Sequence, residues 1–331
     1  MTEAPILDVR DLTVRYRGRD GNVHALDEVS FSVERGKVLA LVGESGAGKT
    51  TAGMSILRLL PQEAEILSGE VGFDGQNLLA LPEQDLRALR GRRIAMIFQD
   101  PIAGLNPVIS IGDQVAEMLT SHIAISKKDA KKQALTILGE MGLADPQRVA
   151  KAFPFQLSGG MCQRVMIGIA TALDPDMIIA DEPTSALDVT VQAQILYQLD
   201  KLRQERGTAI LLITHNFGVV AQLADDVAVL YGGRIVEAGD VEEMHDRPYH
   251  PYTHALLSTL PRLDEAGRQL RSIPGNPPEL SSAPEHCPFI PRCPKVMNEC
   301  RESDAPALSR YNGTQHKVAC YNPVWQSESG A

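Results

Sequence analysis

Residues 43–50 constrain the fold of this chain more than any other stretch. They read Gly-Glu-Ser-Gly-Ala-Gly-Lys-Thr and match G-x-x-x-x-G-K-[ST], the pattern of a loop that surrounds nucleotide phosphates. The apolar run 39–42 before them predicts a buried parallel strand, and residues 51–60 after them predict a helix. A chance glycine-rich turn is the simpler alternative, but a strand and a helix in these positions favour nucleotide binding in an α/β fold.

Two side chains of this loop have predicted roles. The ammonium of Lys49 is expected to reach the β- and γ-phosphates, and the Thr50 hydroxyl is expected to bind Mg²⁺. The residues of this segment predicted to contact the nucleotide are Gly43, Glu44, Ser45, Gly46, Ala47, Gly48, Lys49, Thr50 and Thr51.

Length and charge narrow the class of protein. The 331 residues allow one large domain and a smaller one, and the net charge of -10 argues against a nucleic-acid-binding surface as the main role. Residues 1–8 lack the pattern of a secretory signal, and no uncharged apolar run approaches the roughly 18 residues of a membrane helix. We therefore expect a cytosolic chain that touches a membrane only through partners, with its five cysteines as thiols or metal ligands.

Hydrophobic patterns place the elements along the chain. Strands are predicted at 5–17, 29–34, 69–73, 93–98, 177–180, 209–214, 227–230 and 234–237. From about 100 to 171 the pattern is helical, with helices at 115–121 and 128–141, and a further helix at 191–206 provides a crossover between two strands. The pair Gly232-Gly233 predicts a tight hairpin.

A second stretch with candidate catalytic residues is the apolar strand that ends in Asp181 and Glu182. In a phosphate-loop protein the first acid orients the Mg²⁺ shell, and the second is placed to polarise an attacking water. The alternative is a strand end whose charges only meet solvent, and the upstream loop favours catalysis. His215 follows the strand 209–214 and is a candidate to bond the γ-phosphate or hold the water, although a lone histidine is more often an ordinary surface or core residue.

Residues 157–161, Leu-Ser-Gly-Gly-Met, open a helix about twenty residues before Asp181 and predict another anion-binding helix terminus. With the two motifs above, the chain here resembles the ATP-binding subunit of an ABC transporter, over roughly its first three quarters. The resemblance implies an α/β fold, an ABC-type P-loop ATPase with a RecA-like parallel sheet core, an antiparallel β subdomain and a helical subdomain at about 100–171. It implies a nucleotide-binding domain at 1–245, and the change to a proline- and cysteine-rich composition predicts a small C-terminal extension at 246–331.

The resemblance also implies roles for single residues. Tyr16 is similar to the aromatic residue that stacks on adenine, although a strand aromatic of this kind also packs against a core. Gln99 is similar to the glutamine that contacts Mg²⁺ and the water and senses the membrane partner, so that Thr50, Gln99 and Asp181 form the implied Mg²⁺ set. Glu182 is similar to the general base, and His215 to the switch histidine.

Ser158, Gly159 and Gly160 resemble the signature that binds the γ-phosphate across a dimer interface, and 185–188, which includes Asp188, resembles the loop that crosses to the opposite subunit. The chain departs from the pattern at Met161, where a glutamine is usual, and at Cys162, where close relatives usually carry arginine. The signature donors are intact, so activity is still expected, and Cys162 is most simply a small residue on a helix.

The single copy of each motif has a consequence for assembly. A phosphate loop contacts one side of ATP, and the signature helix of another chain must close the other side. The implied partners are a second ABC ATPase subunit, identical or different, two transmembrane permease subunits and an extracytoplasmic substrate-binding protein, with no nucleic acid. The groove beside Gln99 and the insert 100–171 would receive a short helix of the channel, at the cytoplasmic face of the inner membrane.

Three later segments narrow the resemblance: 250–253, 273–278 and 287–293. With Gln99-Asp100-Pro101 and Leu105-Asn106-Pro107, they resemble the dipeptide/oligopeptide and nickel branch of ABC importers, although residues 102–104 depart from the commoner Met-Thr-Ser. The implied function is an ATP-hydrolysing translocase subunit that powers peptide import. Alternatives are a related importer of nickel, glutathione or another small solute, a non-transport ABC protein, or a redox-sensing ATPase.

Four cysteines of the extension form a candidate metal site: Cys287, Cys293, Cys300 and Cys320. Their gaps of five, six and nineteen residues lack the short C-x₂₋₄-C spacing usual for zinc, whereas iron–sulfur clusters accept looser spacing. Some members of the resembled family carry a [4Fe–4S] cluster in this extension. The cluster is favoured over zinc, in which His286 or His316 is a candidate ligand, and over unmetallated thiols. A structural clamp or a regulatory element is the expected role.

Overall fold

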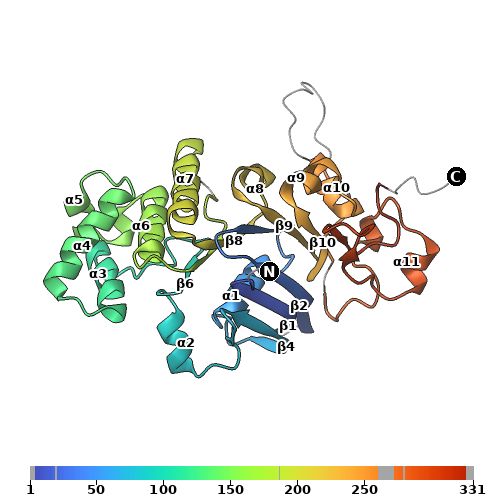
Figure 1. Cartoon of the computed structure of the whole chain (residues 1–331), viewed down its shortest axis with the longest axis horizontal. Coiled ribbons are helices and arrows are strands. Elements are labelled where there is room, and N and C mark those ends of the chain that lie inside the picture. The colour runs from blue at the N-terminus through green and yellow to red at the C-terminus, as the bar shows by residue number, and fades with distance from the viewer. Residues whose placement is uncertain (1–3, 19–20, 186, 260–271, 279, 326–331) are drawn as a thin grey trace. The chain divides into compact units, whose positions relative to one another are not determined.

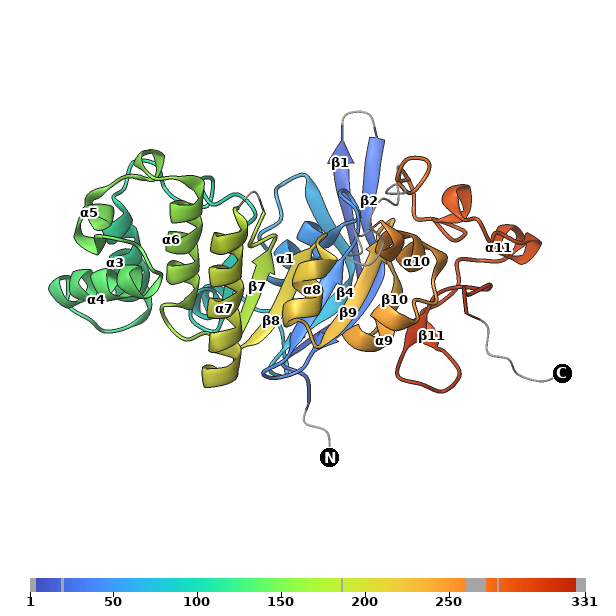
Figure 2. The ribbon, with the colours of Figure 1, turned by 90° about the horizontal axis from the view of Figure 1, so that it is seen from above.

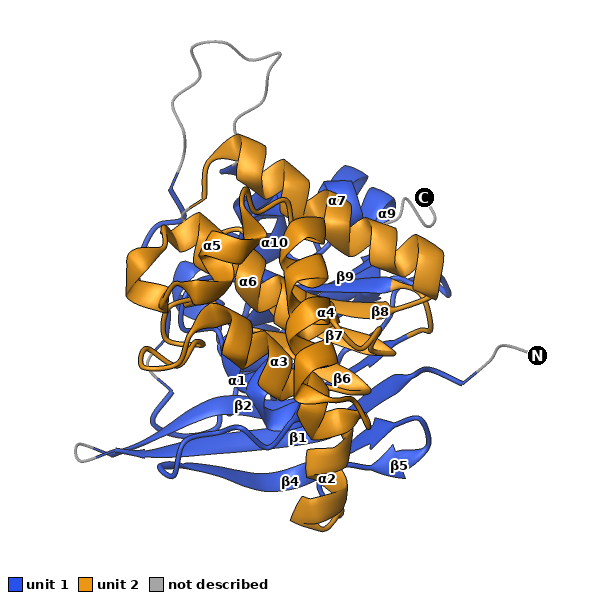
Figure 3. Ribbon diagram, turned by 90° about the vertical axis from the view of Figure 1, so that its left-hand side faces the viewer, with its two compact units in different colours: residues 1–33, 38–79, 213–331 blue, residues 34–37, 80–212 orange. Residues whose placement is uncertain are grey.

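The computed structural model describes residues 4–18, 21–185, 187–259, 272–278 and 280–325. The chain forms two compact units. Unit 1 holds residues 1–33, 38–79 and 213–331, and unit 2 holds 34–37 and 80–212. Figures 1 and 2 label the elements, and Figure 3 colours the two units. Among the described residues, none of the helices combines the length and the hydrophobicity of a membrane-spanning segment.

Unit 1 contains an antiparallel sheet in the order β2-β1-β4-β5. Its strands are β1 (Leu7–Gly18), β2 (Gly21–Val33), β4 (Ala64–Phe73) and β5 (Gln76–Asn77). Strand β2 begins eight residues before the predicted strand 29–34, because pairing with β1 continues past an irregularity in register near Leu12 and Val14. Glu28 adopts a positive φ of 52° there, which interrupts the alternation of side chains that predicts strands.

A second sheet in unit 1 delivers the phosphate loop. Strand β3 (Val38–Val42) is buried at every residue and runs parallel to β9 (Asp226–Tyr231), which turns back antiparallel into β10 (Arg234–Asp240). Gly232 and Gly233, with φ of 55° and 76°, make the two-residue turn, and the predicted hairpin is confirmed. The short strands β12 (Lys317–Val318) and β11 (Ser309–Arg310) extend the edge at β10.

The helices of unit 1 are short. They are α1 (Lys49–Ile56), α8 (Phe217–Leu223), α9 (Val241–Asp246), α10 (Pro251–Ser258) and α11 (Asn298–Glu302), with one 3₁₀ turn, η2 (Ile290–Arg292). Helix α1 ends four residues before the predicted 51–60, because Arg58 takes a left-handed φ of 52°.

One buried carboxylate, that of Glu237, connects residues 249–250 and 316 to the edge of this sheet. Glu237 of β10 accepts hydrogen bonds from the backbone N–H groups of Tyr249 and His250, at 2.6 and 3.0 Å. It also bonds Nε2 of His316 at 2.8 Å, and neither Glu237 nor His316 is exposed to solvent. A carboxylate with three partners satisfies its buried charge, so the residues around 250 and 316 are held together on β10.

Unit 2 combines short parallel strands with a cluster of helices. Strand β6 (Ile94–Ile97) runs parallel to β7 (Met177–Asp181), and β8 (Ala209–Thr214), of which residues 209–212 belong to unit 2, lies next to β7. The helices are α2 (Glu83–Leu89), α3 (Ile111–His122), α4 (Lys127–Glu140), α5 (Pro146–Lys151), α6 (Gly159–Thr171) and α7 (Val189–Arg206), with the 3₁₀ turn η1 (Pro154–Gln156).

Helices α3 to α6 lie together and share one apolar core (Figure 2). Ile111, Val115, Leu119 and Leu138 are buried in it. Helix α3 begins at Ile111 rather than at the predicted 115, because the Ser110 side chain caps it by accepting from the N–H of Asp113. These helices occupy the region expected to be helical, about 100–171.

Candidate functional site

The loop after β3 in unit 1 has the backbone geometry of an anion cradle. Gly48 precedes α1 with a left-handed φ of 106°, and a Cβ atom there would lie 2.4 Å from the carbonyl oxygen of Ala25. Only glycine fits that position. Helix α1 begins directly after it, so its first N–H groups face the loop.

Lys49 is held inside the loop. Its Nζ donates to the carbonyl oxygens of Gly43 at 2.8 Å and of Glu44 at 3.0 Å, and the residue is 8% exposed. The ammonium charge therefore lies within the turn formed by the loop backbone.

Tyr16 of β1 meets the beginning of α1. Its hydroxyl shares a hydrogen bond of 3.2 Å with Oγ1 of Thr51, and its ring is half-buried. Tyr16, a predicted nucleotide contact 35 positions before Thr51, therefore lies beside the phosphate loop. Within the loop Ser45 and Gly46 are exposed, Ala47 is buried and Thr50 is partly exposed.

Unit 2 carries the predicted acids at the end of β7. Asp181 and Glu182 are 1% and 8% exposed, and Glu182 has a positive φ of 46°, a conformation that is unfavourable for a side chain of this size. The Nε2 group of Gln163, on α6, donates to the carbonyl of Pro183 at 2.8 Å. Gln163 thus ties the signature helix to the turn after Glu182, a contact that sequence reasoning did not predict.

One signature residue and one residue of the predicted crossing loop cap helices of unit 2. The Ser158 side chain accepts from the N–H of Met161 and caps α6, with Gly159 exposed and Gly160 next to it. Asp188 caps α7 by accepting from the N–H of Val191 at 2.9 Å. Ala186, of the predicted crossing loop, lies outside the described residues.

Cys162 belongs to the core of the helical cluster. It is not exposed, its Sγ lies 3.5 Å from the carbonyl of Pro154, and burial raises the pKa of its thiol. These features agree with the interpretation of Cys162 as a small core residue.

Gln99 and His215 both lie just beyond strand ends. Gln99 is exposed after β6 in unit 2, and His215 is exposed after β8 in unit 1. The predicted residues are therefore divided between the two units. Unit 1 holds Tyr16, the loop 43–51 and His215, and unit 2 holds Gln99, Ser158, Gly159, Gly160, Asp181, Glu182 and Asp188.

The four cysteines of the extension converge. All line one small cavity of about 20 Å³, together with His250 and Phe289. Burial raises the pKa of Cys287 to about 11 and that of Cys320 to about 12, and it raises the pKa of Cys293 as well. Four soft sulfur donors around one cavity are the kind of donor set that iron or zinc binds. Among the described residues, however, no group of three or more His, Cys, Asp and Glu side chains has the arrangement to hold a metal ion, so this site stays a prediction.

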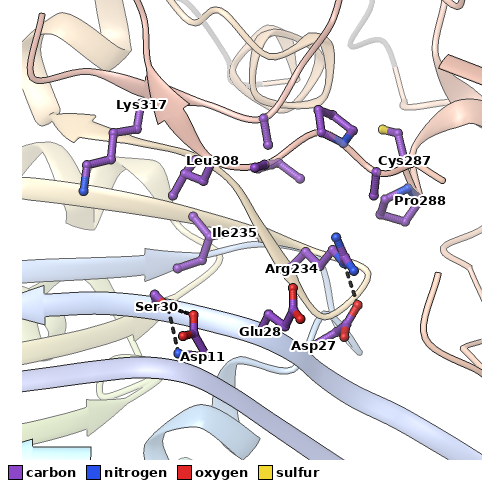
Figure 4. Close-up of a pocket in the computed structure, with 15 residues that line it drawn as sticks. Asp11, Asp27, Glu28, Ser30, Arg234, Ile235, Cys287, Pro288, Leu308 and Lys317 are labelled. Carbon is purple, nitrogen blue, oxygen red and sulfur yellow. Dashed lines mark hydrogen bonds and ion pairs between the residues drawn. The ribbon is translucent and has the colours of Figure 1, made fainter. Parts of the chain in front are cut away.

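A separate pocket of about 310 Å³ lies in unit 1 (Figure 4). Its polar groups include a pair of Arg234 and the buried Asp27, with 2.5 Å between Nε and Oδ2, while Asp11 accepts from Ser30 at 3.0 Å. Cys287 also lines it, but the residues that line it include none of those predicted to contact nucleotide.

Two family models match the chain. Residues 26–185 match the model described as "ABC transporter", and residues 236–300 match "Oligopeptide/dipeptide transporter, C-terminal region".

Curated relatives resemble most of the chain. The oligopeptide transport ATP-binding protein OppD of Salmonella typhimurium is 42% identical over 98% of this chain and 97% of its own length. The dipeptide transport ATP-binding protein DppD of Bacillus subtilis is 45% identical over 89% of this chain and 88% of its own length. The OppD protein of Mycobacterium tuberculosis is 46% identical over 96% of this chain, which spans 52% of that relative.

Solved structures share the fold. The dimeric ATP-binding cassette MJ0796, bound to ADP and Pi in a post-hydrolysis state, superimposes with a TM-score of 0.64 at 29% identity, over 71% of this chain and 98% of its own. For cbiO1 from Clostridium perfringens, part of the transporter complex cbiONQ, the TM-score is 0.60 at 27% identity, over 74% and 92% of the two chains.

Proposed function

The chain belongs to the ABC transporter family and carries the C-terminal region of oligopeptide and dipeptide transporters, and we propose that it is the ATP-hydrolysing subunit that powers peptide import through a membrane permease. One observation carries the proposal: a phosphate loop with a buried lysine occurs in the same chain as the peptide-transporter C-terminal region. The loop indicates the chemistry, and the C-terminal region indicates the branch.

The proposed roles of single residues are those that the resemblance to ABC ATPases implies. The loop 43–51 binds the phosphates, and the half-buried ring of Tyr16 stacks on adenine. Thr50, Gln99 and Asp181 would hold Mg²⁺, which would supply positive charge to the phosphates. Glu182 takes a proton from the attacking water, and His215 orients that water or the γ-phosphate.

The proposed assembly pairs two ATPase subunits. Ser158, Gly159 and Gly160 on α6 bind the γ-phosphate held by the loop of the other subunit, and ATP shifts the population toward the closed pair. Unit 2 exposes large apolar side chains, with Phe155 72%, Val108 79% and Ile102 53% exposed, which suits contact with a permease. We place the protein peripherally at the cytoplasmic face of the membrane, with a domain boundary near residue 246.

Peptide uptake tests the proposed function. Proteoliposomes that contain this chain with a peptide-importer permease, a second ATPase subunit and a binding protein are expected to take up labelled tripeptide only when ATP is inside. An excess of unlabelled peptide should abolish the signal, while nickel and glutathione should not. If nickel or glutathione abolished the uptake instead, the protein would still be a transporter ATPase, but its proposed peptide cargo would be wrong.

We also propose that the four cysteines hold a [4Fe–4S] cluster that clamps the extension. The ligands would be Cys287, Cys293, Cys300 and Cys320, which line one apolar cavity. A bound cluster would supply a cross-link between parts of the chain that carry little core of their own. Zinc is the alternative.

Metal content tests the cluster. Anaerobically purified protein is expected to contain about four iron atoms per chain and to absorb near 400 nm, and Cys300→Ser should lose both. Cys162→Ala is the matched control, because Cys162 lies in the helical core of unit 2 and should leave the iron content unchanged. Stoichiometric zinc without iron, or a Cys300→Ser variant with full iron, would contradict the cluster.

A further inference from the structure

Three segments of the extension resemble the dipeptide/oligopeptide and nickel branch, and their contacts converge on one residue of the phosphate loop, Glu44. These segments are 250–253, 273–278 and 287–293, and each supplies a contact to Glu44 or to the side chain that holds it. All of them, and Glu44, lie in unit 1. The nucleotide chemistry proposed above does not use these contacts.

Arg292 makes the strongest of the contacts. Its Nη1 lies 2.7 Å from Oε2 of Glu44 and its Nη2 lies 3.0 Å from Oε1, a two-pronged pair in which the arginine side chain is 4% exposed. A guanidinium that meets a carboxylate through two parallel hydrogen bonds fixes the orientation of both groups.

The remaining donors of Arg292 are also used. Nε donates to the carbonyl of Pro274 at 2.9 Å, Nη2 to that of Ile273 at 3.4 Å, and Nη1 to the hydroxyl of Tyr231 at 3.2 Å. A guanidinium has five N–H donors, so the surrounding chain accounts for the whole group. Arg292 is thus held rigidly and presents a fixed fork to Glu44.

Tyr252 holds the backbone of the same loop residue. Its hydroxyl accepts a hydrogen bond of 3.0 Å from the N–H of Glu44, and its ring packs against Tyr231 and Phe289, with centroids 4.4 and 5.4 Å away. None of these three rings is more than 1% exposed. Glu44 is therefore held at its main chain by Tyr252, which precedes the four cysteines, and at its side chain by Arg292, which lies between Cys287 and Cys293.

Glu44 also contacts Lys49, the lysine predicted to bind phosphate. The carbonyl of Glu44 accepts one hydrogen bond from Nζ of Lys49, and the carbonyl of Gly43 accepts another. A displacement of Glu44 would therefore move acceptors that locate the ammonium. Arg292 also directly precedes Cys293, so the cysteine-lined cavity and the loop share one rigid connection.

We propose that Arg292 is a positioning residue for nucleotide binding: by clamping Glu44 it sets the loop and Lys49, and it makes nucleotide affinity depend on the fold of the cysteine-bearing extension. This inference rests on the proposed nucleotide site at residues 43–51. The extension would thereby help to set the position of the phosphate loop in its own chain.

Titration of the purified full-length protein with a fluorescent ATP analogue tests the clamp. Arg292→Ala is expected to raise the Kd about tenfold, since loss of a charge-assisted pair costs a factor of this order. Arg292→Lys keeps the charge without the fork and should fall between Arg292→Ala and wild type. In assembled transporter, the KM for ATP should rise while kcat stays within about twofold, because Arg292 does not touch the reacting atoms.

Glu44→Gln separates the clamp from damage to the extension, since it changes no side chain of the extension and replaces only one of the two acceptors of Arg292. It should also weaken binding, and Arg292→Ala should add little to it, because both changes remove the same pair. Arg301→Ala, an exposed arginine on α11, is the matched control and should bind like wild type.

Wild-type affinity in both Arg292→Ala and Glu44→Gln would overturn the inference and leave the nucleotide site standing. Independent, additive losses in the double variant would overturn it as well. A wild-type protein that binds no nucleotide would overturn the proposed function and this inference with it.

Discussion

Replacing Glu182 by glutamine is expected to lower ATP hydrolysis at least about a hundredfold while nucleotide binding is retained. The carboxamide has nearly the same size and shape, so the turn after β7 should keep its structure. It cannot accept a proton from water, however, and the loss of a general base costs a factor of about 10² to 10⁴. ATP should then accumulate unhydrolysed, and the closed pair of subunits should persist.

Phosphate release from the assembled transporter measures the first effect, and size-exclusion chromatography with ATP and Mg²⁺ measures the second. Glu205→Gln, an exposed glutamate on α7 of the same unit, should behave like wild type in both. Hydrolysis within a few-fold of wild type in Glu182→Gln would remove Glu182 from the role of base.

The backbone at Glu182 supports the choice of this residue. Its positive φ of 46° is unfavourable for a non-glycine residue, and such conformations persist where the surroundings enforce them, often at functional sites. The buried Gln163 amide donates a hydrogen bond to the carbonyl of Pro183, the residue directly after Glu182, and is one such restraint. The side chain of Glu182 is therefore held rather than free to sample the surface.

Elements with strong local signals were predictable. Strand β8 occupies the predicted 209–214, and the glycine pair at 232–233 forms the turn between β9 and β10. Strand β3 is buried on both faces, so its apolar run and the glycine-rich loop after it were readable without tertiary information. The ABC-type α/β fold predicted from the motifs is confirmed by the match to solved cassettes.

Boundaries set by single backbone residues were less predictable. Helix α1 stops early at the left-handed Arg58, and β2 continues through the left-handed Glu28, where pairing with β1 overrides the sequence pattern. Arginine and glutamate have no local preference for a positive φ, so these two conformations depend on tertiary context and cannot be predicted from residue type.

Contacts between distant residues were not predictable at all. Arg292 and Glu44 are separated by 248 positions, and no periodicity links them. The one available signal was a charged residue in the otherwise apolar, proline-rich segment 287–293. An arginine in such a segment requires a partner when buried, but its identity depends on the folded chain.

Replacing Lys49 by alanine is expected to weaken ATP binding about a hundredfold and to abolish measurable hydrolysis. The buried ammonium is the cation of the loop, held between the carbonyls of Gly43 and Glu44, and phosphate oxygens are its natural acceptors. Loss of charge-assisted bonds to phosphate, about 3 kcal/mol together, corresponds to a factor of about a hundred in Kd.

Calorimetric titration of the full-length protein with ATP and Mg²⁺ measures this loss, and Lys37→Ala is the control. Lys37 is an exposed lysine directly before β3, so it carries the same charge near the same strand without entering the loop. Binding should fall only in Lys49→Ala, and hydrolysis should fall with it, because the lysine serves both the ground state and the transition state. If Lys49→Ala bound ATP like the control, the phosphates would have to lie elsewhere, and the interpretation of residues 43–51 would be wrong. Comparison with Glu182→Gln then separates binding from chemistry, since that variant should retain the affinity that Lys49→Ala loses.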